Sequence, residues 1–120
     1  LVKNVVNKDG KIIKESKNEV LSDVTSSEIA NKIRDYMVDV VNYGTAKGAY
    51  LQSVQIAGKS GTVDKEGGGV DMWFVGFAPA YDPKIAFSIV IEDADSLSGE
   101  VAVPIGGQMV NSIINNVNLN

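Results

Sequence analysis

The most informative absences in this 120-residue sequence are those of cysteine and histidine, neither of which occurs. Without cysteine the chain can form no disulfide and no thiolate metal site, and its redox compartment stays open. Without histidine it lacks the commonest general base and the commonest metal ligand. A Ser-His-Asp triad therefore cannot be built from these residues alone.

Positive charge and long apolar runs are also scarce. The net charge is −4, the pI is near 4.7, and the eleven Lys and Arg residues are scattered. A nucleic-acid binder should show a basic patch, so we expect no nucleic-acid partner. No apolar run approaches the roughly 20 residues that a membrane helix needs, and no signal peptide is visible. The first residue is Leu1, which favours a fragment of a longer parent, whose targeting segments this sequence would not report.

The remaining composition is that of an ordinary folded domain. Apolar residues make up 44% and charged residues 22% of the chain, the usual globular balance. At this length folding can bury roughly two thirds of the unfolded surface, which is enough for a core. No internal repeat and no domain boundary is visible. We therefore expect residues 1–120 to form a single partial domain.

The first part of the chain is predicted to form a hairpin and a helix. Residues 1–15 are typical of two short strands around Asp9-Gly10, a favoured turn pair because glycine tolerates positive φ. A capping-box pattern at 25–28 predicts a helix start, and Gly44 is a natural stop. Apolar residues at helical spacing should form its buried face: Ile29, Ile33, Tyr36, Met37, Val40 and Val41.

The second part is predicted to hold three strands and a last helix. Segments 53–63, 71–80 and 84–92 have strand composition, and short turns join them, so they should be antiparallel neighbours. From about Val101 a helix should carry five side chains inward: Ile105, Met109, Ile113, Ile114 and Val117. The fold class is therefore α+β. It combines an antiparallel sheet, made of a three-strand meander plus the hairpin, with packed helices.

Residues 58–62 read Gly-Lys-Ser-Gly-Thr and raise the question of function. A nucleotide-binding P-loop ends in the same Gly-Lys-Ser, but its first glycine should stand where this chain has Ser53, and a helix should follow. Here Gly61 and a β-branched pair follow instead. A lysine beside a turn at a strand end is the plain alternative. Against it, the string lies in an extended segment, and a strand containing Trp73 comes after one loop.

Together with its surroundings, the string resembles the carboxy-terminal part of the transpeptidase domain of penicillin-binding proteins. That family carries S-x-x-K, S-x-N and K-[TS]-G in order, and AGKSGTV at 57–63 looks like the third motif. The segment DMWFVGFAPAYDPKIAFSIVIE is similar to the two strands after it, and VAVPIGGQMVNSII to the closing helix. The hairpin and GTAKGAY fit the stretch before the motif. FVGFAP and DPKIA lean towards the monofunctional, class B members.

The resemblance implies a serine D,D-transpeptidase with the serine β-lactamase/transpeptidase fold. The parent would form an acyl-enzyme with a peptidoglycan stem peptide ending in D-Ala-D-Ala, and pass the acyl group to an amine on a neighbouring stem. β-Lactam antibiotics would acylate the same serine. No cofactor and no metal is implied. The parent would work at the extracytoplasmic face of the bacterial cell membrane, held by an amino-terminal anchor outside this sequence.

For single residues, the resemblance places Lys59, Ser60 and Gly61 in the catalytic motif, on a strand against which the donor peptide would lie as an added strand. Lys59 would set an ammonium near the donor carboxylate, and Thr62 would bind that carboxylate. A backbone N–H at Val63 or nearby would help to form the oxyanion hole. Strand alternation, however, turns Lys59 and Thr62 to opposite faces. Either the strand twists or bulges at Gly61, or the roles divide along its edge.

Two of the three family motifs are not expected to function in this chain. S-x-x-K does not occur in residues 1–120, so the nucleophilic serine and its lysine are missing. S-x-N occurs once, at Ser16-Lys17-Asn18, in a charged segment too close to the third motif, and chance explains it better. Covalent catalysis needs a nucleophile and a base within hydrogen-bond reach. The chain alone should therefore be inactive and should need the rest of the transpeptidase domain.

Two related functions stay open on the sequence. A serine β-lactamase or D,D-carboxypeptidase shares the K-[TS]-G strand but hands the acyl group to water. A non-catalytic sensor domain uses the same scaffold to bind β-lactams. Sequence upstream of this chain would separate them, because a glycosyltransferase or dimerisation module indicates wall synthesis and a multi-span membrane segment indicates a sensor.

Several other features have structural explanations. The acidic loop 92–95 lacks the glycine and ligand spacing of a calcium site, and residues 64–66 should decorate the tip beside the motif, with contact to substrate as the alternative. Gly106-Gly107 predicts either close packing of the last helix or a later helix start. Four aromatic residues are expected in the core and not on a ligand platform: Trp73, Phe74, Phe77 and Phe87.

Overall fold

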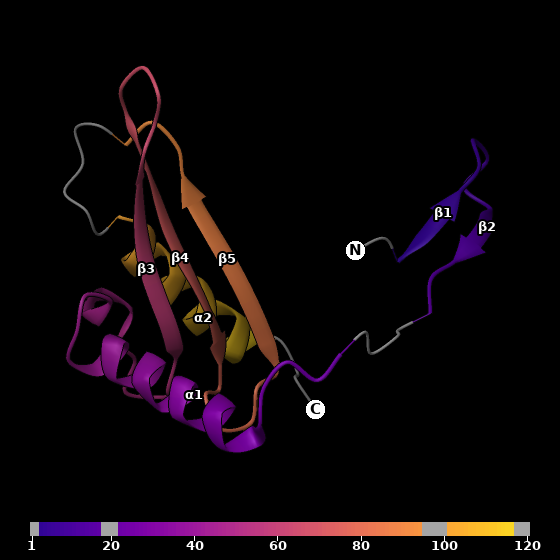
Figure 1. The fold of residues 1–120 in the computed structure, drawn as a ribbon. Helices are drawn as coiled ribbons and strands as arrows, with labels where there is room; N and C mark the ends of the chain where they lie inside the picture. The colour runs from indigo at the N-terminus through magenta and orange to yellow at the C-terminus, as the bar shows by residue number, and fades with distance from the viewer. Residues whose placement is uncertain (1–2, 18–21, 95–100, 117–120) are drawn as a thin grey trace.

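The structure of the chain, a computed structural model, describes residues 3–17, 22–94 and 101–116 (Figure 1). Within these ranges the predicted order of hairpin, helix, three strands and helix is confirmed. The elements are β1 (Asn4–Val6), β2 (Ile12–Glu15), α1 (Ser27–Asn42), the 3-10 helix η1 (Lys47–Ala49), β3 (Ala57–Asp64), β4 (Val70–Ala78), β5 (Ile85–Ile91) and α2 (Ala102–Asn116).

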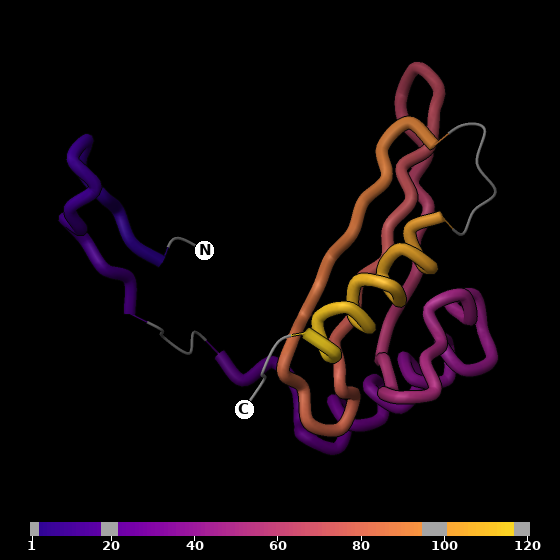
Figure 2. Tube along the Cα trace, turned by 180° about the vertical axis from the view of Figure 1, so that it is seen from behind, coloured from indigo at the N-terminus to yellow at the C-terminus, as the bar shows by residue number. Residues whose placement is uncertain are grey.

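Two antiparallel sheets account for all five strands in the described ranges. The hairpin β1–β2 forms one sheet, and the meander forms the other in the order β3-β4-β5. The β3–β4 register runs without a shift from Ala57 opposite Phe77 to Asp64 opposite Val70. Helix α2 lies behind this sheet in Figure 1 and in front of it in Figure 2, so it covers one face. The α+β fold class is thus confirmed, but the hairpin does not join the meander in one sheet as predicted, because β1 and β2 pair only with each other in the described residues.

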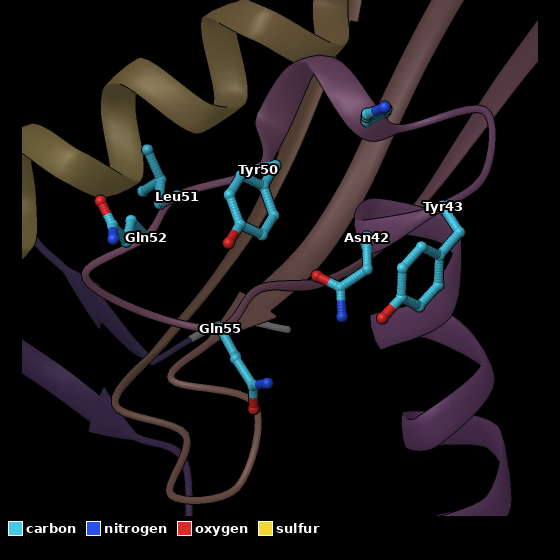
Figure 3. A pocket seen from close by; sticks show the side chains of 7 residues that line it. Asn42, Tyr43, Tyr50, Leu51, Gln52 and Gln55 are labelled. Carbon is cyan, nitrogen blue, oxygen red and sulfur yellow. The ribbon is translucent and has the colours of Figure 1, made fainter.

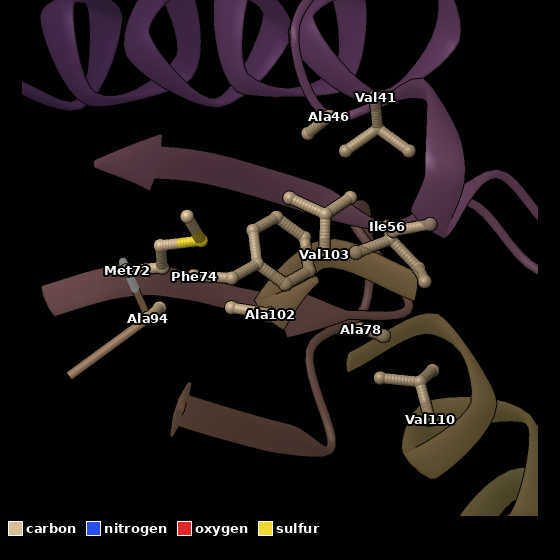
Figure 4. Close-up of a cluster of buried hydrophobic side chains, with 11 residues drawn as sticks. Val41, Ala46, Ile56, Met72, Phe74, Ala78, Ala94, Ala102, Val103 and Val110 are labelled. Atoms are coloured by element: carbon tan, nitrogen blue, oxygen red, sulfur yellow. The ribbon is translucent and has the colours of Figure 1, made fainter. Parts of the chain in front are cut away.

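Alternation along β4 decides which side chains enter the core. Met72 and Phe74 are buried towards α2, whereas Trp73 and Val75 are exposed on the opposite face, as the two-residue period of a strand requires. The core between the sheet and the helices contains side chains from α1, α2 and β4, among them Val41, Phe74, Val103 and Val110 (Figure 4). Trp73 was expected in this core, and that prediction is wrong because its strand position faces away from α2.

Two adjacent glycines let α2 approach the sheet closely. A Cβ at Gly106 would stand 2.4 Å from Cδ1 of Phe74, and a Cβ at Gly107 would stand 2.8 Å from Cα of Ala49. Both distances are far below normal carbon contact. The helix begins at Ala102 and includes both glycines. Close packing, and not a later start, therefore explains the Gly-Gly pair.

The predicted buried faces of both helices need correction. In α1 the buried residues are Val38 and Val41, with Met37 and Val40 partly buried, while the amino-terminal half exposes Ile29, Ile33 and Tyr36. The reason is that only the carboxy-terminal half of α1 packs on the start of β3, where Val38 clusters with Ala57. In α2 the glycines form the contact face, so Ile105 is exposed and Val110 is buried instead. Val117 lies outside the described residues.

The start of α1 also differs in detail from the predicted capping box. Ser26 is the N-cap, and its Oγ accepts a hydrogen bond from the Ile29 N–H at 3.3 Å. Glu28 does not reach back to the cap; it accepts from Lys32 Nζ at 2.9 Å, one turn along the helix. One capping hydrogen bond and one i,i+4 ion pair thus begin the helix.

Candidate active-site strand

The Gly-Lys-Ser-Gly-Thr string lies in β3, at the edge of the three-stranded sheet. In the described part of the chain β3 pairs only with β4. An edge strand leaves half of its backbone N–H and C=O groups without a strand partner, and an extended peptide can add to them. The predicted open sheet margin is therefore present, and it is extended as expected.

Lys59 lies on β3 opposite Val75, so it faces away from α2. The side chain is exposed, and its Nζ donates to the carbonyl oxygen of Ser60 at 2.6 Å. No carboxylate of the described residues pairs with it. An ammonium has three donors, so Lys59 keeps hydrogen-bonding capacity for an anionic group beside the strand.

Ser60 turns to the other face, opposite the buried Phe74. Its Oγ lies 2.9 Å from Oγ1 of Thr45, a residue of the loop between α1 and η1. This hydrogen bond ties the middle of the motif to the segment that precedes β3. The sequence analysis did not identify Thr45, because a single hydroxyl in a loop has no periodicity or motif spacing to mark it.

The backbone passes Gly61 without a bulge. Gly61 stands opposite Trp73 and Thr62 opposite Met72 in an unbroken register. A Cβ on Gly61 would meet only Cβ of Trp73, at an ordinary 3.7 Å. The predicted alternative of a bulge is therefore wrong. Lys59 and Thr62 alternate across the strand, and only its twist or a division of roles along the edge can bring both to one ligand. Val63 continues the strand and is exposed.

An ion-pair cluster holds the end of β3 next to the motif. Lys65 Nζ lies 2.5 Å from Asp93 Oδ1 and 3.7 Å from Asp71 Oδ1, and the Asp93 N–H donates to Asp71 at 3.2 Å. The hydrogen bond to Asp93, together with the charge of Asp71, raises the pKa of Lys65 above its ordinary value. The tip predicted at 64–66 is therefore tied to the segment after β5.

Three other features predicted or considered from the sequence can be checked in the described ranges. The backbone N–H of Ser16 donates to Lys3 O and closes the base of the hairpin, while Asn18 of the S-x-N tripeptide lies outside those ranges. The acidic residues of the described ranges form no cluster that could hold a metal ion. No helix of the described ranges is both long enough and apolar enough to span a membrane.

Comparison with known proteins connects this strand to a family. The family described as penicillin binding protein transpeptidase domain matches residues 1–111. The chain belongs to this transpeptidase family. The K-S-G motif at residues 59–61 of this family member lies on the edge strand β3, as the resemblance implies.

Curated relatives of this transpeptidase chain include a peptidoglycan D,D-transpeptidase and a sporulation protein. Peptidoglycan D,D-transpeptidase PbpA of Mycolicibacterium smegmatis is 39% identical over 92 residues, which are 68% of this chain and 18% of that protein. Stage V sporulation protein D of Bacillus subtilis is 29% identical over 109 residues, 83% of this chain and 17% of that protein. The chain thus spans less than a fifth of the length of these relatives.

Solved transpeptidase structures share the fold. The D,D-transpeptidase domain of a peptidoglycan glycosyltransferase from Eggerthella lenta superposes with a TM-score of 0.70 and 31% identity, covering 97% of this chain and 27% of that one. The imipenem acyl-enzyme complex of penicillin-binding protein A from Mycobacterium tuberculosis gives 0.69 and 27%, covering 93% and 25%. The serine β-lactamase/transpeptidase-like fold expected for the chain is thereby supported.

Proposed function

We propose that the chain is the carboxy-terminal part of a D,D-transpeptidase that cross-links peptidoglycan stem peptides through a serine acyl-enzyme. The observation that carries the proposal is the K-S-G motif on an exposed edge strand of a family member. Relatives with the name peptidoglycan D,D-transpeptidase favour transfer to an amine over a β-lactamase, a carboxypeptidase or a sensor. The nucleophilic serine would come from the rest of the transpeptidase domain.

In this proposal β3 is the wall on which the donor peptide lies. A stem peptide ending in D-Ala-D-Ala would pair with the open edge, so that backbone hydrogen bonds supply affinity. The Lys59 ammonium would attract its terminal carboxylate, and Thr62 would bind that carboxylate. Gly61 would let the ligand approach the backbone because it has no Cβ. The N–H of Val63 or a neighbour would contribute to the oxyanion hole.

The proposal extends to partners and location. β-Lactam antibiotics would bind at the same strand, since the related structure from Mycobacterium tuberculosis holds imipenem as an acyl-enzyme. Cell-wall relatives support work on the extracytoplasmic face of the bacterial membrane, with an anchor outside this sequence. The chain's own partner would be the remainder of the transpeptidase domain, which would lie on the other side of the donor peptide from β3.

Labelling with a fluorescent penicillin tests the proposal on the full-length protein and on the 120-residue chain. We expect covalent labelling of the full-length protein only. Lys59→Ala should slow labelling at least about a hundredfold, because it removes a charge aimed at the reacting ligand. Lys32→Ala is the matched control, since Lys32 is an exposed lysine of α1 paired with Glu28. An unchanged rate in Lys59→Ala would remove Lys59 from the site.

A second assay separates transfer from hydrolysis. The full-length protein is given a D-Ala-D-Ala peptide together with a D-amino acid acceptor. Formation of the exchanged peptide supports a transpeptidase. Release of D-alanine without the exchanged product would indicate a carboxypeptidase instead, and penicillin binding without turnover would indicate a sensor.

A further inference from the structure

A pocket lies where the chain leaves α1 and returns to the sheet, apart from residues 59–63 of the motif. Its volume is about 440 Å³, within the range of small-molecule sites. Figure 3 shows the rings of Tyr43 and Tyr50 on either side of the Asn42 amide. Six polar side chains line it: Asn42, Tyr43, Lys47, Tyr50, Gln52 and Gln55.

The side chains of this pocket have unused hydrogen-bonding capacity. Among the described residues, none of the six polar side chains makes a hydrogen bond or ion pair. Tyr43 is 83% exposed and Tyr50 is 55% exposed. Each amide offers donors and acceptors, and each tyrosine adds a hydroxyl to an apolar ring. The pocket thus presents two aromatic faces and several neutral polar groups to a ligand.

The chemistry of the lining restricts the class of ligand. No carboxylate lines the pocket, which argues against a metal ion or an amine. Lys47 is the one charged group in the lining, too little to balance a polyphosphate. The pocket is formed by a helix end, η1 and loops, so it has no strand edge to which a peptide could add. With these ligand classes excluded, the lining fits a neutral ligand whose ring has an apolar face and carries hydroxyl and amide groups.

We propose that this pocket binds an N-acetylated saccharide. The tyrosine rings would pack on the C–H face of a sugar ring, and the side-chain amides would hydrogen-bond its hydroxyl and acetamido groups. The inference rests on the lining of the pocket and not on the proposed transpeptidase activity. If that activity holds, the glycan strand that carries the stem peptides is a ligand of this class.

The pocket is physically joined to the motif strand. Thr45 lies between two pocket residues, Tyr43 and Lys47, and its hydroxyl contacts Ser60 on β3. Gln55 precedes β3 by two positions, and its carbonyl oxygen accepts from the Ala80 N–H at 2.9 Å. A saccharide held here would therefore lie against the segment that supports β3, beside and not within the peptide-binding edge.

Calorimetric titration of the full-length protein with chitohexaose, a β-1,4-linked oligomer of N-acetylglucosamine, tests the inference. We expect saturable binding that weakens at least about tenfold in Tyr50→Ala and in Gln52→Met, which keeps side-chain length but removes the amide. Tyr36→Ala should bind like the wild type, because Tyr36 is a 67% exposed tyrosine of α1 outside the pocket. Cellohexaose, which lacks acetamido groups, should bind at least about tenfold more weakly.

Any one of three results would overturn the inference. The wild type could fail to bind chitohexaose saturably up to millimolar concentration, or both pocket variants could bind it as tightly as the wild type. The third such result is that the wild type binds cellohexaose as tightly as chitohexaose. Penicillin labelling of the wild-type protein is measured separately. Labelling without chitohexaose binding defeats only the saccharide site, and chitohexaose binding without labelling defeats only the proposed transpeptidase.

Discussion

At the scale of single residues, Thr45 supports the motif from the face opposite Lys59. Its hydroxyl makes the hydrogen bond to Ser60 Oγ at 2.9 Å. A neutral hydrogen bond contributes about 1 kcal/mol, which corresponds to about fivefold in a rate if the strand geometry depends on it. We expect Thr45→Val, which keeps the shape but removes the hydroxyl, to slow acylation of the full-length protein by fluorescent penicillin about fivefold.

Thr45→Ser is the control for this prediction because it keeps the hydroxyl. It should acylate within about twofold of the wild type. A double variant with Ser60→Ala should add little to the loss in Thr45→Val, since the two hydroxyls act as one pair. Normal acylation in Thr45→Val would show that the hydrogen bond does not position β3.

The titration of Lys65 reports the ion pairs with Asp71 and Asp93 that hold the end of β3. The hydrogen bond to Asp93, with Asp71 and Glu92 nearby, raises its pKa above 10.5. A raised pKa in the folded state means that the ion pair stabilises fully below pH 10.5 and that this contribution is lost as pH rises through the higher value. We expect Lys65 Nζ, followed by NMR, to titrate above 10.5 in the wild type and closer to 10.5 in Asp93→Asn.

The control is Asp82→Asn, because Asp82 pairs with Lys84 and not with Lys65. That variant should leave the Lys65 titration unchanged. If Lys65 titrates at the same pH in the wild type and in Asp93→Asn, the hydrogen bond does not persist in solution.

At the scale of elements, the contact of α2 with the sheet depends on the absence of a side chain at Gly106. Replacing glycine by alanine in a helix gains about 1 kcal/mol of propensity. The new Cβ would overlap the ring of Phe74, which is fully buried, and approach Ile89 Cδ1 at 3.2 Å. Overpacking of this kind costs about 1–3 kcal/mol, so the clash outweighs the propensity. We expect Gly106→Ala to lower the thermal unfolding midpoint of the full-length protein.

Gly48→Ala is the matched substitution with room for the new group. Its Cβ would find Pro104 and Val103 at 3.5 Å, an ordinary contact. We expect its unfolding midpoint to stay close to that of the wild type. A Gly106→Ala protein as stable as Gly48→Ala would mean that α2 does not pack on Phe74 as described.

The two long helices and the motif strand show how much of the fold and of the candidate site could be predicted from the sequence. Among the described residues, apolar periodicity and turn residues predicted the five strands and the two long helices, because those signals are local. The buried faces were mispredicted because α2 contacts the sheet through glycines and α1 through only half of its length. In the candidate site, the motif together with the segments around it predicted that Lys59 lies on a strand to which a peptide can add, and β3 is an edge strand in the described residues. The role of Thr45 depends on the contact of its loop with β3, and the pocket depends on how residues 42–55 fold back on themselves. No spacing in the sequence records either arrangement.

At the scale of the whole molecule, the sheet face opposite α2 remains apolar and exposed. Trp73, Val75 and Val90 are each 38% exposed there, and Trp73 stands directly opposite Val90 in the register. Such a patch on a soluble protein usually marks a surface that another segment or partner covers. In the proposed function that cover is the rest of the transpeptidase domain, since this chain spans only 27% of the solved Eggerthella lenta domain.

Trp73 makes this expectation measurable because it is the single tryptophan of the chain. In the isolated 120-residue chain, acrylamide should quench the Trp73 fluorescence readily, and the face should bind a hydrophobic dye. In the full-length protein the emission that Trp73→Phe removes should be protected from acrylamide. Val90→Thr, which makes the bare face more polar, should reduce dye binding by the isolated chain, whereas Val24→Thr, at a residue exposed outside the sheet, should not. Equal quenching of Trp73 in the two proteins would show that the face stays open in the intact enzyme, because a covering segment must exclude the quencher from the indole ring.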